Sequence, residues 1–407
     1  MDSSLIYDWN ELGRTPVGKP VTFDDETLRD GLQSPSVIDP PIEKKLQILH
    51  LMENLGIESA NIGLPGAGPR AVADVERLAR EIVTCRMKLR PNCAARTTPA
   101  DVRPIVEISQ RVGIAIEVAT FIGSSPIRHY AEDWTLDRML TVSEEAVRLA
   151  VGEGLPVMFV TEDTIRSRPE TIVQLYRSAI DWGARAIVCC DTVGHATPQG
   201  VRNLIQYVRR EVIEPTGRAI RLDWHGHSDR GLAVINSIAA VEAGADQVHG
   251  CGLGIGERVG NTPMDLLLAN LKLMGYIDRD LTSLRLYVEA ISEATGIPIP
   301  ANYPVFGRDA FRTATGVHAA AVIKALQKGD TKLANVVYSG VPCHDFGLEQ
   351  QIEIGPMSGK SNVIYWLRRR QIEPDHSTVE RIFAMAKQSD RVLTETEILS
   401  AVRSSGK

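Results

Sequence analysis

Residues 220–254 read IRLDWHGHSDRGLAVINSIAAVEAGADQVHGCGLG. Two short runs in this stretch, Ile220–His227 and Gln247–Gly254, have the apolar and β-branched character of strands. Between them, apolar residues over 232–241 recur every three or four positions, and Gly244 follows, which is typical of a helix and its C-terminal stop. The stretch therefore predicts one strand–helix unit followed by the next strand.

The same unit recurs through the first 255 residues, with strands starting about 30 residues apart, the length of one βα unit. Eight regular units more often close into a barrel than lie in an open sheet, so we expect an α/β fold with a TIM (β/α)8 barrel. The other predicted strands are Val21–Leu28, Glu58–Leu64, Lys88–Ala95, Ala115–Gly123, Pro156–Asp163 and Arg185–Gly194.

At 407 residues the chain is longer than such a barrel, which needs roughly 250. Small, mainly helical subdomains are expected after the barrel, with late helices at Ser377–Ala386 and Glu395–Val402. The predicted boundaries are an N-terminal extension at 1–20, the barrel at 21–276, a linker and first subdomain at 277–345, and a second helical subdomain at 346–407.

Composition excludes several classes of protein. No apolar run approaches the roughly 20 residues of a membrane span, and a net charge of −6 without a dense basic block argues against nucleic acid as a partner. Residues 1–15 lack the pattern of a signal peptide, so a cytoplasmic location is expected. The six cysteines form no C-x-x-C pair and are interpreted as reduced, small core residues.

Ionisable residues gather where the predicted strands end, which is the end of a β/α-barrel that carries its chemistry. Within the seventh strand His225 and His227 alternate, so both imidazoles point to one face. With Asp30, they make a three-ligand set that leaves coordination positions open, as a catalytic metal requires. Zinc, manganese or, less comfortably, magnesium would suit these ligands.

Each of these residues also has a plainer interpretation. An H-x-H pair arises by chance about as often as by function. Asp30 could cap a helix with Arg29 as a surface ion-pair partner, and Asp191 could cap the helix that follows it. The glycines after the eighth strand could merely turn the chain.

The motifs together resemble those of the α-isopropylmalate synthase and homocitrate synthase family, in the short form without a leucine-regulatory domain. The resemblance runs from about residue 22 to 363 and rests on segments in the family's order. These are Glu26-Thr-Leu-Arg29-Asp30-Gly-Leu-Gln33, Glu162-Asp163 within VTEDTIR, Asp191-Thr-Val-Gly, His225-Gly-His227-Ser-Asp229, Gly254-Ile-Gly256-Glu257-Arg258-Val-Gly260-Asn261, Thr315-Gly-Val-His318 and Ser358-Gly-Lys-Ser-Asn362.

The resemblance implies a metal-dependent Claisen-type condensation of acetyl-CoA with a 2-oxo acid, giving a 2-hydroxy diacid. It implies that Asn261 joins the three metal ligands, that Arg29 stabilises the developing alkoxide, and that Thr192 binds the substrate carboxylate. It also places Gln33 and Arg128 among the substrate-binding residues, and Gly254, Gly256 and Glu257 among the cofactor-binding residues.

The resemblance implies that His318, assisted by Glu162 and Tyr338, is the base that removes a proton from the acetyl group. Because His318 and Tyr338 lie beyond the barrel, the resemblance implies a homodimer in which they complete the partner's active site. Taken alone, His318 would be expected to be a partly buried structural histidine.

The chain departs from the family pattern at three places. Asn61 stands where relatives have glutamate, and Ser228 and Arg230 replace the usual residues after the H-x-H pair. Arg128 stands where isopropylmalate synthases tend to have histidine, and it could bind a second substrate carboxylate or be a surface residue.

Two alternatives stay open. One is a metal-dependent lyase of the same barrel superfamily, acting on hydroxymethylglutaryl-CoA or a 4-hydroxy-2-oxo acid. The glycine-rich loop at 254–261 lacks the reactive cysteine expected of the former. The other is a barrel that has lost catalysis, against which the presence of Arg29, Asp30, both histidines and His318 argues.

Overall fold

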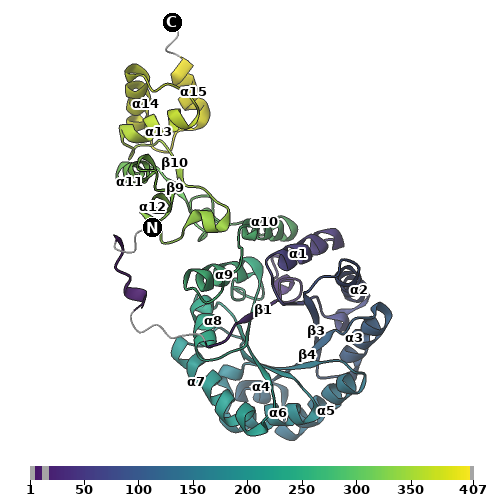
Figure 1. The fold of residues 1–407 in the computed structure, drawn as a ribbon. Coiled ribbons are helices and arrows are strands. Elements are labelled where there is room, and N and C mark those ends of the chain that lie inside the picture. Colours follow the sequence, from purple (N-terminus) through teal and green to yellow (C-terminus); the bar gives the residue numbers. More distant parts are fainter. Residues whose placement is uncertain (1–4, 12–17, 404–407) are drawn as a thin grey trace. The chain divides into compact units, whose positions relative to one another are not determined.

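The computed structural model describes residues 5–11 and 18–403, and the chain divides into two compact units. One unit is Thr15–Pro298, and the other combines Met1–Arg14 with Ile299–Lys407. The first unit contains a closed barrel of eight parallel strands, which confirms the predicted fold class (Figure 1). The strands are β1 Thr22–Asp25, β2 Ser59–Asn61, β3 Arg90–Arg96, β4 Glu117–Gly123, β5 Val157–Glu162, β6 Ala186–Asp191, β7 Arg221–Gly226 and β8 Gln247–Gly250.

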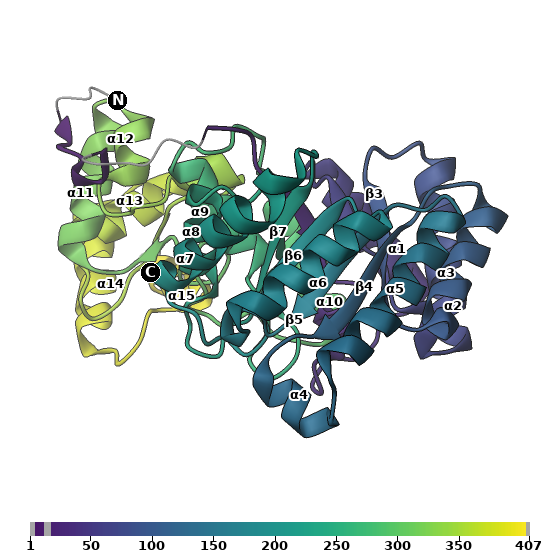
Figure 2. The same cartoon turned by 90° about the horizontal axis from the view of Figure 1, so that it is seen from below.

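Helices form a ring outside these strands (Figure 1). The first helix ends just before Gly56, whose φ of +69° favours glycine. A short extra helix, α4, follows β4 and projects from one end of the barrel (Figure 2). The helices are α1 Ile42–Asn54, α2 Pro69–Thr84, α3 Pro99–Val112, α4 Pro126–Glu132, α5 Leu136–Gly152, α6 Pro169–Trp182, α7 Pro198–Val208, α8 Ala233–Glu242, α9 Met264–Leu273 and α10 Leu284–Thr295.

Strand order determines which loops meet. β1 pairs with β8, with Asp24 opposite His249, and β8 pairs with β7. Since all strands are parallel, the segments that leave β1, β7 and β8 emerge side by side at one end of the barrel. Residues about 220 positions apart in the sequence are thereby brought together.

Four predicted strands are too long at their C-terminal ends. The second was predicted to reach Leu64 but ends at Asn61, and the sixth was predicted to reach Gly194 but ends at Asp191. The first was predicted to reach Leu28 but ends at Asp25, and the eighth was predicted to reach Gly254 but ends at Gly250. The chain turns there because Gly252 N–H donates to the Thr27 hydroxyl, and a side chain at Gly252 would meet the Tyr287 ring at 2.8 Å. Both strands therefore end early enough to leave their polar residues on loops.

The second unit is mainly helical, as expected, but it also contains a two-stranded parallel sheet that the sequence did not predict. It has two apolar cores, one around α11 and α12 and one around α13 to α15. Among the described residues, no helix is both long and apolar enough to cross a membrane. The elements are β9 Arg312–Thr313, α11 Gly316–Gln327, α12 Thr331–Val336, β10 Gln351–Ile352, α13 Lys360–Arg369, α14 His376–Gln388 and α15 Glu395–Arg403.

All six cysteines are free, and five of them are buried, as expected of small core residues. Cys85 is the exception, because it is exposed at the end of α2. Its thiol lies on the outer surface of the barrel unit, where it donates to Glu81.

Candidate active site

A cavity of about 210 Å³ opens among the loops that follow the barrel strands. The lining residues from β7, β8 and the segments after β1, β7 and β8 are polar, whereas those from β3 to β6 and the segments after β2 and β6 are mostly apolar. The predicted site residues that line it are Arg29, Asp30, Gln33, Glu162, Thr192, His225, His227 and Glu257.

The predicted metal ligands form a compact group in this cavity. One ligand atom from each of Asp30, His225 and His227 lies within 4.8 Å of the other two, and all three residues are buried. The Nε2 atom of His225 is 3.6 Å from Oδ2 of Asp30. The separation leaves room for a metal between the two atoms, because metal–ligand bonds of about 2 Å require ligand atoms roughly 3 Å or more apart.

Atoms without partners support this assignment. Nδ1 of His227 and Oδ1 of Asn261 are both buried with no hydrogen-bond partner in the described structure. A β-bridge joins the backbones of the same two residues, which fixes Asn261 beside His227, although of the two only His227 lines the cavity. Buried polar atoms without partners are costly, and a bound cation would satisfy them. The helix-capping alternative for Asp30 is wrong, because its side chain makes no capping hydrogen bond.

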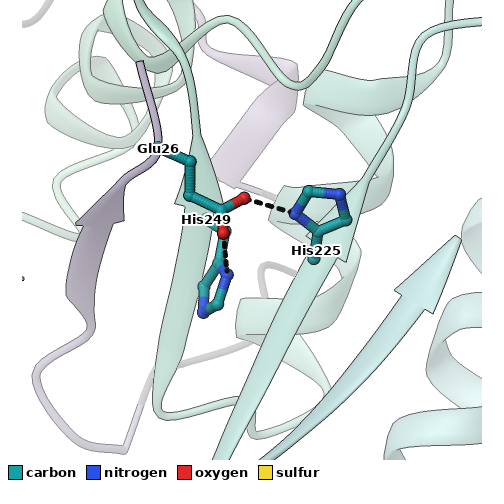
Figure 3. Close-up of side chains that lie close together, drawn as sticks. All are labelled: Glu26, His225 and His249. Carbon is teal, nitrogen blue, oxygen red and sulfur yellow. Dashed lines mark ion pairs between the residues drawn. The ribbon is translucent and has the colours of Figure 1, made fainter. Parts of the chain in front are cut away.

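Two residues of the site were missed by sequence reasoning. Glu26 and His249 are buried beside His225, and one carboxylate connects the two imidazoles (Figure 3). Oε2 of Glu26 lies 2.6 Å from Nδ1 of His225, and Oε1 lies 3.5 Å from Nδ1 of His249. The sequence offered two signals for these residues. His249 lies within the predicted eighth strand, and Glu26 stands three residues before Arg29.

Burial and neighbouring charges shift the pKa values of this group. Burial, together with the neighbouring His225, lowers the pKa of His227 to about 4, so its imidazole is neutral and available as a ligand. Burial would also lower the pKa of His249, but Glu26 and the other carboxylates around it outweigh burial and raise it to about 10. Burial opposes ionisation of Glu26, yet Arg29 and the histidines hold its pKa well below the ordinary range.

Arg29 lies largely inside the barrel mouth beside the predicted metal ligands, with 17% of its side chain exposed. Its guanidinium lies 2.6 Å from Glu26 and 3.1 Å from Asp30, while its Nε is buried without a partner.

Glu162 lines the same cavity, and burial raises the pKa of its carboxyl group. The Thr192 hydroxyl accepts a hydrogen bond from the Asp163 backbone N–H. Asp191 accepts from the backbone N–H groups of His195 and Ala196 in the following loop, and the interpretation that it caps the next helix is wrong, because Thr197 caps α7.

Arg128, on α4, is not among the residues that line the cavity. Its guanidinium lies 3.2 Å from Glu132 and 3.8 Å from Glu162.

The glycines of the loop after β8 are required by close packing. A Cβ on Gly256 would meet the Asn261 amide at 2.2 Å, and Gly254 has a φ of +63°. These contacts hold Asn261 in place.

Three of the four residues that depart from the expected pattern make side-chain hydrogen bonds within the barrel unit. Asn61 is buried and accepts from the backbone N–H of Gly63. Ser228 contacts the carbonyl of Asn261, and Arg230 donates to the carbonyl of His195.

His318 and Tyr338 lie in the second unit, on α11 and just after α12. Their rings stack, with centroids 4.1 Å apart and an interplanar angle of 26°. Both side chains are exposed, so the interpretation of His318 as a partly buried structural histidine is wrong.

The fold and the cavity define the class: a (β/α)8 barrel with a buried carboxylate–histidine site at the C-terminal ends of its strands. A family model described as HMGL-like matches residues 20–291, and the chain belongs to this HMGL-like family.

Similar sequences span nearly the whole chain. A homocitrate synthase of Methanopyrus kandleri is 32% identical over 387 residues, which covers 93% of this chain and 91% of that protein. A probable 2-isopropylmalate synthase of Ignicoccus hospitalis is 31% identical, with 91% and 88% covered. Among solved structures, the HMG-CoA lyase of Bacillus subtilis has a TM-score of 0.59 at 20% identity, covering 70% of this chain and 97% of the lyase. At that identity the likeness concerns the fold alone.

Proposed function

We propose that this chain is an acyltransferase that condenses acetyl-CoA with a 2-oxo acid in a metal-dependent, Claisen-type reaction. The observation that carries the proposal is the buried Asp30–His225–His227 group facing a cavity, with His227 Nδ1 and Asn261 Oδ1 unpartnered. The synthase names of relatives that match about nine tenths of the chain support the same reaction.

Asp30, His225, His227 and Asn261 would hold the divalent metal, zinc, manganese or magnesium, which when bound polarises the ketone of the 2-oxo acid. Arg29 stabilises the charge that develops on the ketone oxygen. Its position suits this role, because Glu26 and Asp30 fix the guanidinium before substrate arrives and Nε is left unpartnered. Thr192, Gln33 and Glu257 line the cavity and would contact the substrates.

Proton removal from the acetyl group needs a base within reach of the cavity. We assign this role to His318, with Glu162 and Tyr338 assisting. The stacking of His318 on Tyr338 fixes an exposed imidazole, as a residue that must meet a substrate requires. In this proposal the chain forms a homodimer, and His318 and Tyr338 of one protomer complete the site of its partner.

The cavity wall favours a 2-oxo acid with an aliphatic side chain. Its apolar side includes Leu64, Phe121 and Met158. The arginines that line it, Arg29 and Arg258, are already paired with carboxylates. A second substrate carboxylate would therefore lie against apolar carbon without a free cation, which is costly.

The lyase alternative has less support. The thiol nearest the glycine-rich loop, Cys251, is buried, and burial raises its pKa well above the ordinary range. Such a thiol stays protonated and is a poor nucleophile.

The decisive experiment measures thiol release from acetyl-CoA with a panel of 2-oxo acids, with and without chelator. Metal-dependent release is expected, strongest with 2-oxoisovalerate or a similar aliphatic acid and weak with 2-oxoglutarate. No release with any acid, combined with cleavage of hydroxymethylglutaryl-CoA, would establish the lyase instead.

A further inference from the structure

The Glu26 carboxylate is an acceptor shared by three cationic or donor groups. Oε1 receives the Arg29 guanidinium at 2.6 Å and lies 3.5 Å from His249, while Oε2 lies 2.6 Å from Nδ1 of His225. An ionised carboxylate can accept at both oxygens, whereas any other side chain of this size offers fewer acceptors. Glu26 therefore contacts Arg29 and the proposed metal ligand His225 at once, and Figure 3 shows its carboxylate reaching both His225 and His249.

The 2.6 Å contact excludes Glu26 as a ligand of the same metal as His225 through Nδ1. A metal between the two atoms would hold them roughly 3 Å or more apart. The contact instead places Oε2, which otherwise has no hydrogen-bond partner in the described structure, at the distance from which it can accept the Nδ1–H of His225. With its proton on Nδ1, the imidazole directs the lone pair of Nε2 toward Asp30, which lies 3.6 Å from that atom.

His249 is held on its other side. Its Nε2 lies 3.4 Å from Asp223, whose carboxylate receives Nε of Arg221 at 3.0 Å. Asp24 is 3.9 Å from Nδ1 of the same imidazole. The ring is buried among three carboxylates, Asp24, Glu26 and Asp223, so its place in the barrel is fixed from several directions.

We propose that Glu26 and His249 are positioning residues for the metal site: Glu26 fixes the tautomer and orientation of His225, and His249 fixes Glu26. This inference rests on the proposed function, because it needs Asp30, His225 and His227 to bind a metal. Partners of this kind commonly contribute 10- to 100-fold to metal affinity, because they hold the ligand side chain in its binding orientation before the metal arrives.

The test compares E26Q with E117Q, the same substitution in the same barrel interior. Glu117 lies at the end of the series of ion pairs that runs from His249 through Asp223 and Arg221. It accepts a hydrogen bond from Arg221 at 3.0 Å. Mn²⁺ binding to the metal-free proteins is measured by the loss of the free-ion signal in electron paramagnetic resonance. A glutamine at 26 retains one acceptor and adds N–H donors that face His225 or Arg29, so affinity is expected to fall about 10- to 100-fold. E117Q should bind Mn²⁺ as the unmodified chain does.

H249Q provides a second route if E26Q fails to fold, which circular dichroism of the metal-free protein would reveal. The Mn²⁺ affinity of H249Q should lie between those of the two other variants: weaker than that of E117Q and stronger than that of E26Q. Because His249 acts through Glu26, the E26Q/H249Q double variant should bind Mn²⁺ no more weakly than E26Q alone. Additive losses, or Mn²⁺ affinities equal to that of E117Q, would overturn the inference. Thiol release by the unmodified chain tests the proposed function separately, so the two failures are distinguishable.

Discussion

Two groups of three potential metal ligands in the barrel unit make an informative contrast. Asp30, His225 and His227 lie at the barrel mouth, and His50, Glu81 and Cys85 lie on α1 and α2 at the outer surface. Within each group the ligand atoms are within 4.8 Å of one another. Proximity of suitable side chains is therefore the same in both.

The groups differ in burial and in unsatisfied atoms. The barrel-mouth ligands are buried, and Nδ1 of His227 has no partner. In the surface group, His50 lies 2.8 Å from Glu81, whose other oxygen receives Arg77 at 2.7 Å. Water reaches His50, whose side chain is 45% exposed. The contrast teaches that a metal site is indicated by buried atoms left unpaired rather than by ligand types that meet.

The largest expected effect comes from removing one histidine of each group. H227A deletes a ligand from the buried group, so Mn²⁺ affinity should fall more than about 100-fold, beyond the loss of a mere supporting partner. Metal-dependent thiol release should be abolished. H50A should change neither, as the same titration and assay would show. Full activity of H227A, or loss of Mn²⁺ binding in H50A, would contradict the assignment of the metal site to the buried group.

His318 sharpens the contrast because it is exposed like His50 but is proposed to be functional. H318A should lower turnover about 10²- to 10⁴-fold, the usual contribution of a general base. Binding of the 2-oxo acid, measured by calorimetry in the absence of acetyl-CoA, should be unchanged. Loss of that binding would show that His318 has a structural role instead.

Burial should also determine the sign of a pH effect on stability. Burial raises the pKa of Asp25, beneath the barrel mouth, from 3.8 to about 7. The folded state then binds more protons than the unfolded state between those values, so stability falls as pH rises from about 4 to 7 and is constant above. In D25N this fall, on the order of 1–4 kcal/mol, should be missing.

Urea unfolding midpoints at pH 5 and pH 8 measure this effect for both proteins. The asparagine oxygen can still accept from the Thr27 backbone N–H, and its amide N–H can donate to the Tyr287 hydroxyl, which can itself donate to the Thr27 hydroxyl, so D25N is expected to fold. An identical pH dependence in D25N and the unmodified chain would assign the slope to other groups.

The smallest effect is expected at Glu81 of the surface group, with the opposite sign. Hydrogen bonds from Arg77 and His50 lower its pKa from 4.5 to about 2. Its contribution to stability is present above pH 4.5 and is lost as pH falls through that range toward 2. Thermal unfolding midpoints of E81Q and the unmodified chain should therefore converge between pH 6 and pH 3.5. Convergence toward high pH would contradict the assignment.

Much of the fold could be predicted because the pattern is local. Strands and helices alternate with distinct periods, and eight repeats predict closure. Strand ends were predicted less well: β8 ends at Gly250 because Tyr287, from α10, packs against Gly252, and no local pattern reports that contact. The two-stranded sheet of the second unit was missed because each of its strands has only two residues.

The sequence by itself predicted the candidate metal ligands at the barrel mouth, since Asp30, His225 and His227 follow from alternation along a strand and from the strand-end rule. It did not reveal that Glu26 and His249 lie against His225 in the same site. Those two residues are 223 positions apart, and only the pairing of β1 with β8 brings them within 3.5 Å. Hydrogen bonds and pKa shifts depend on distance and burial, which are properties of the closed barrel rather than of any segment.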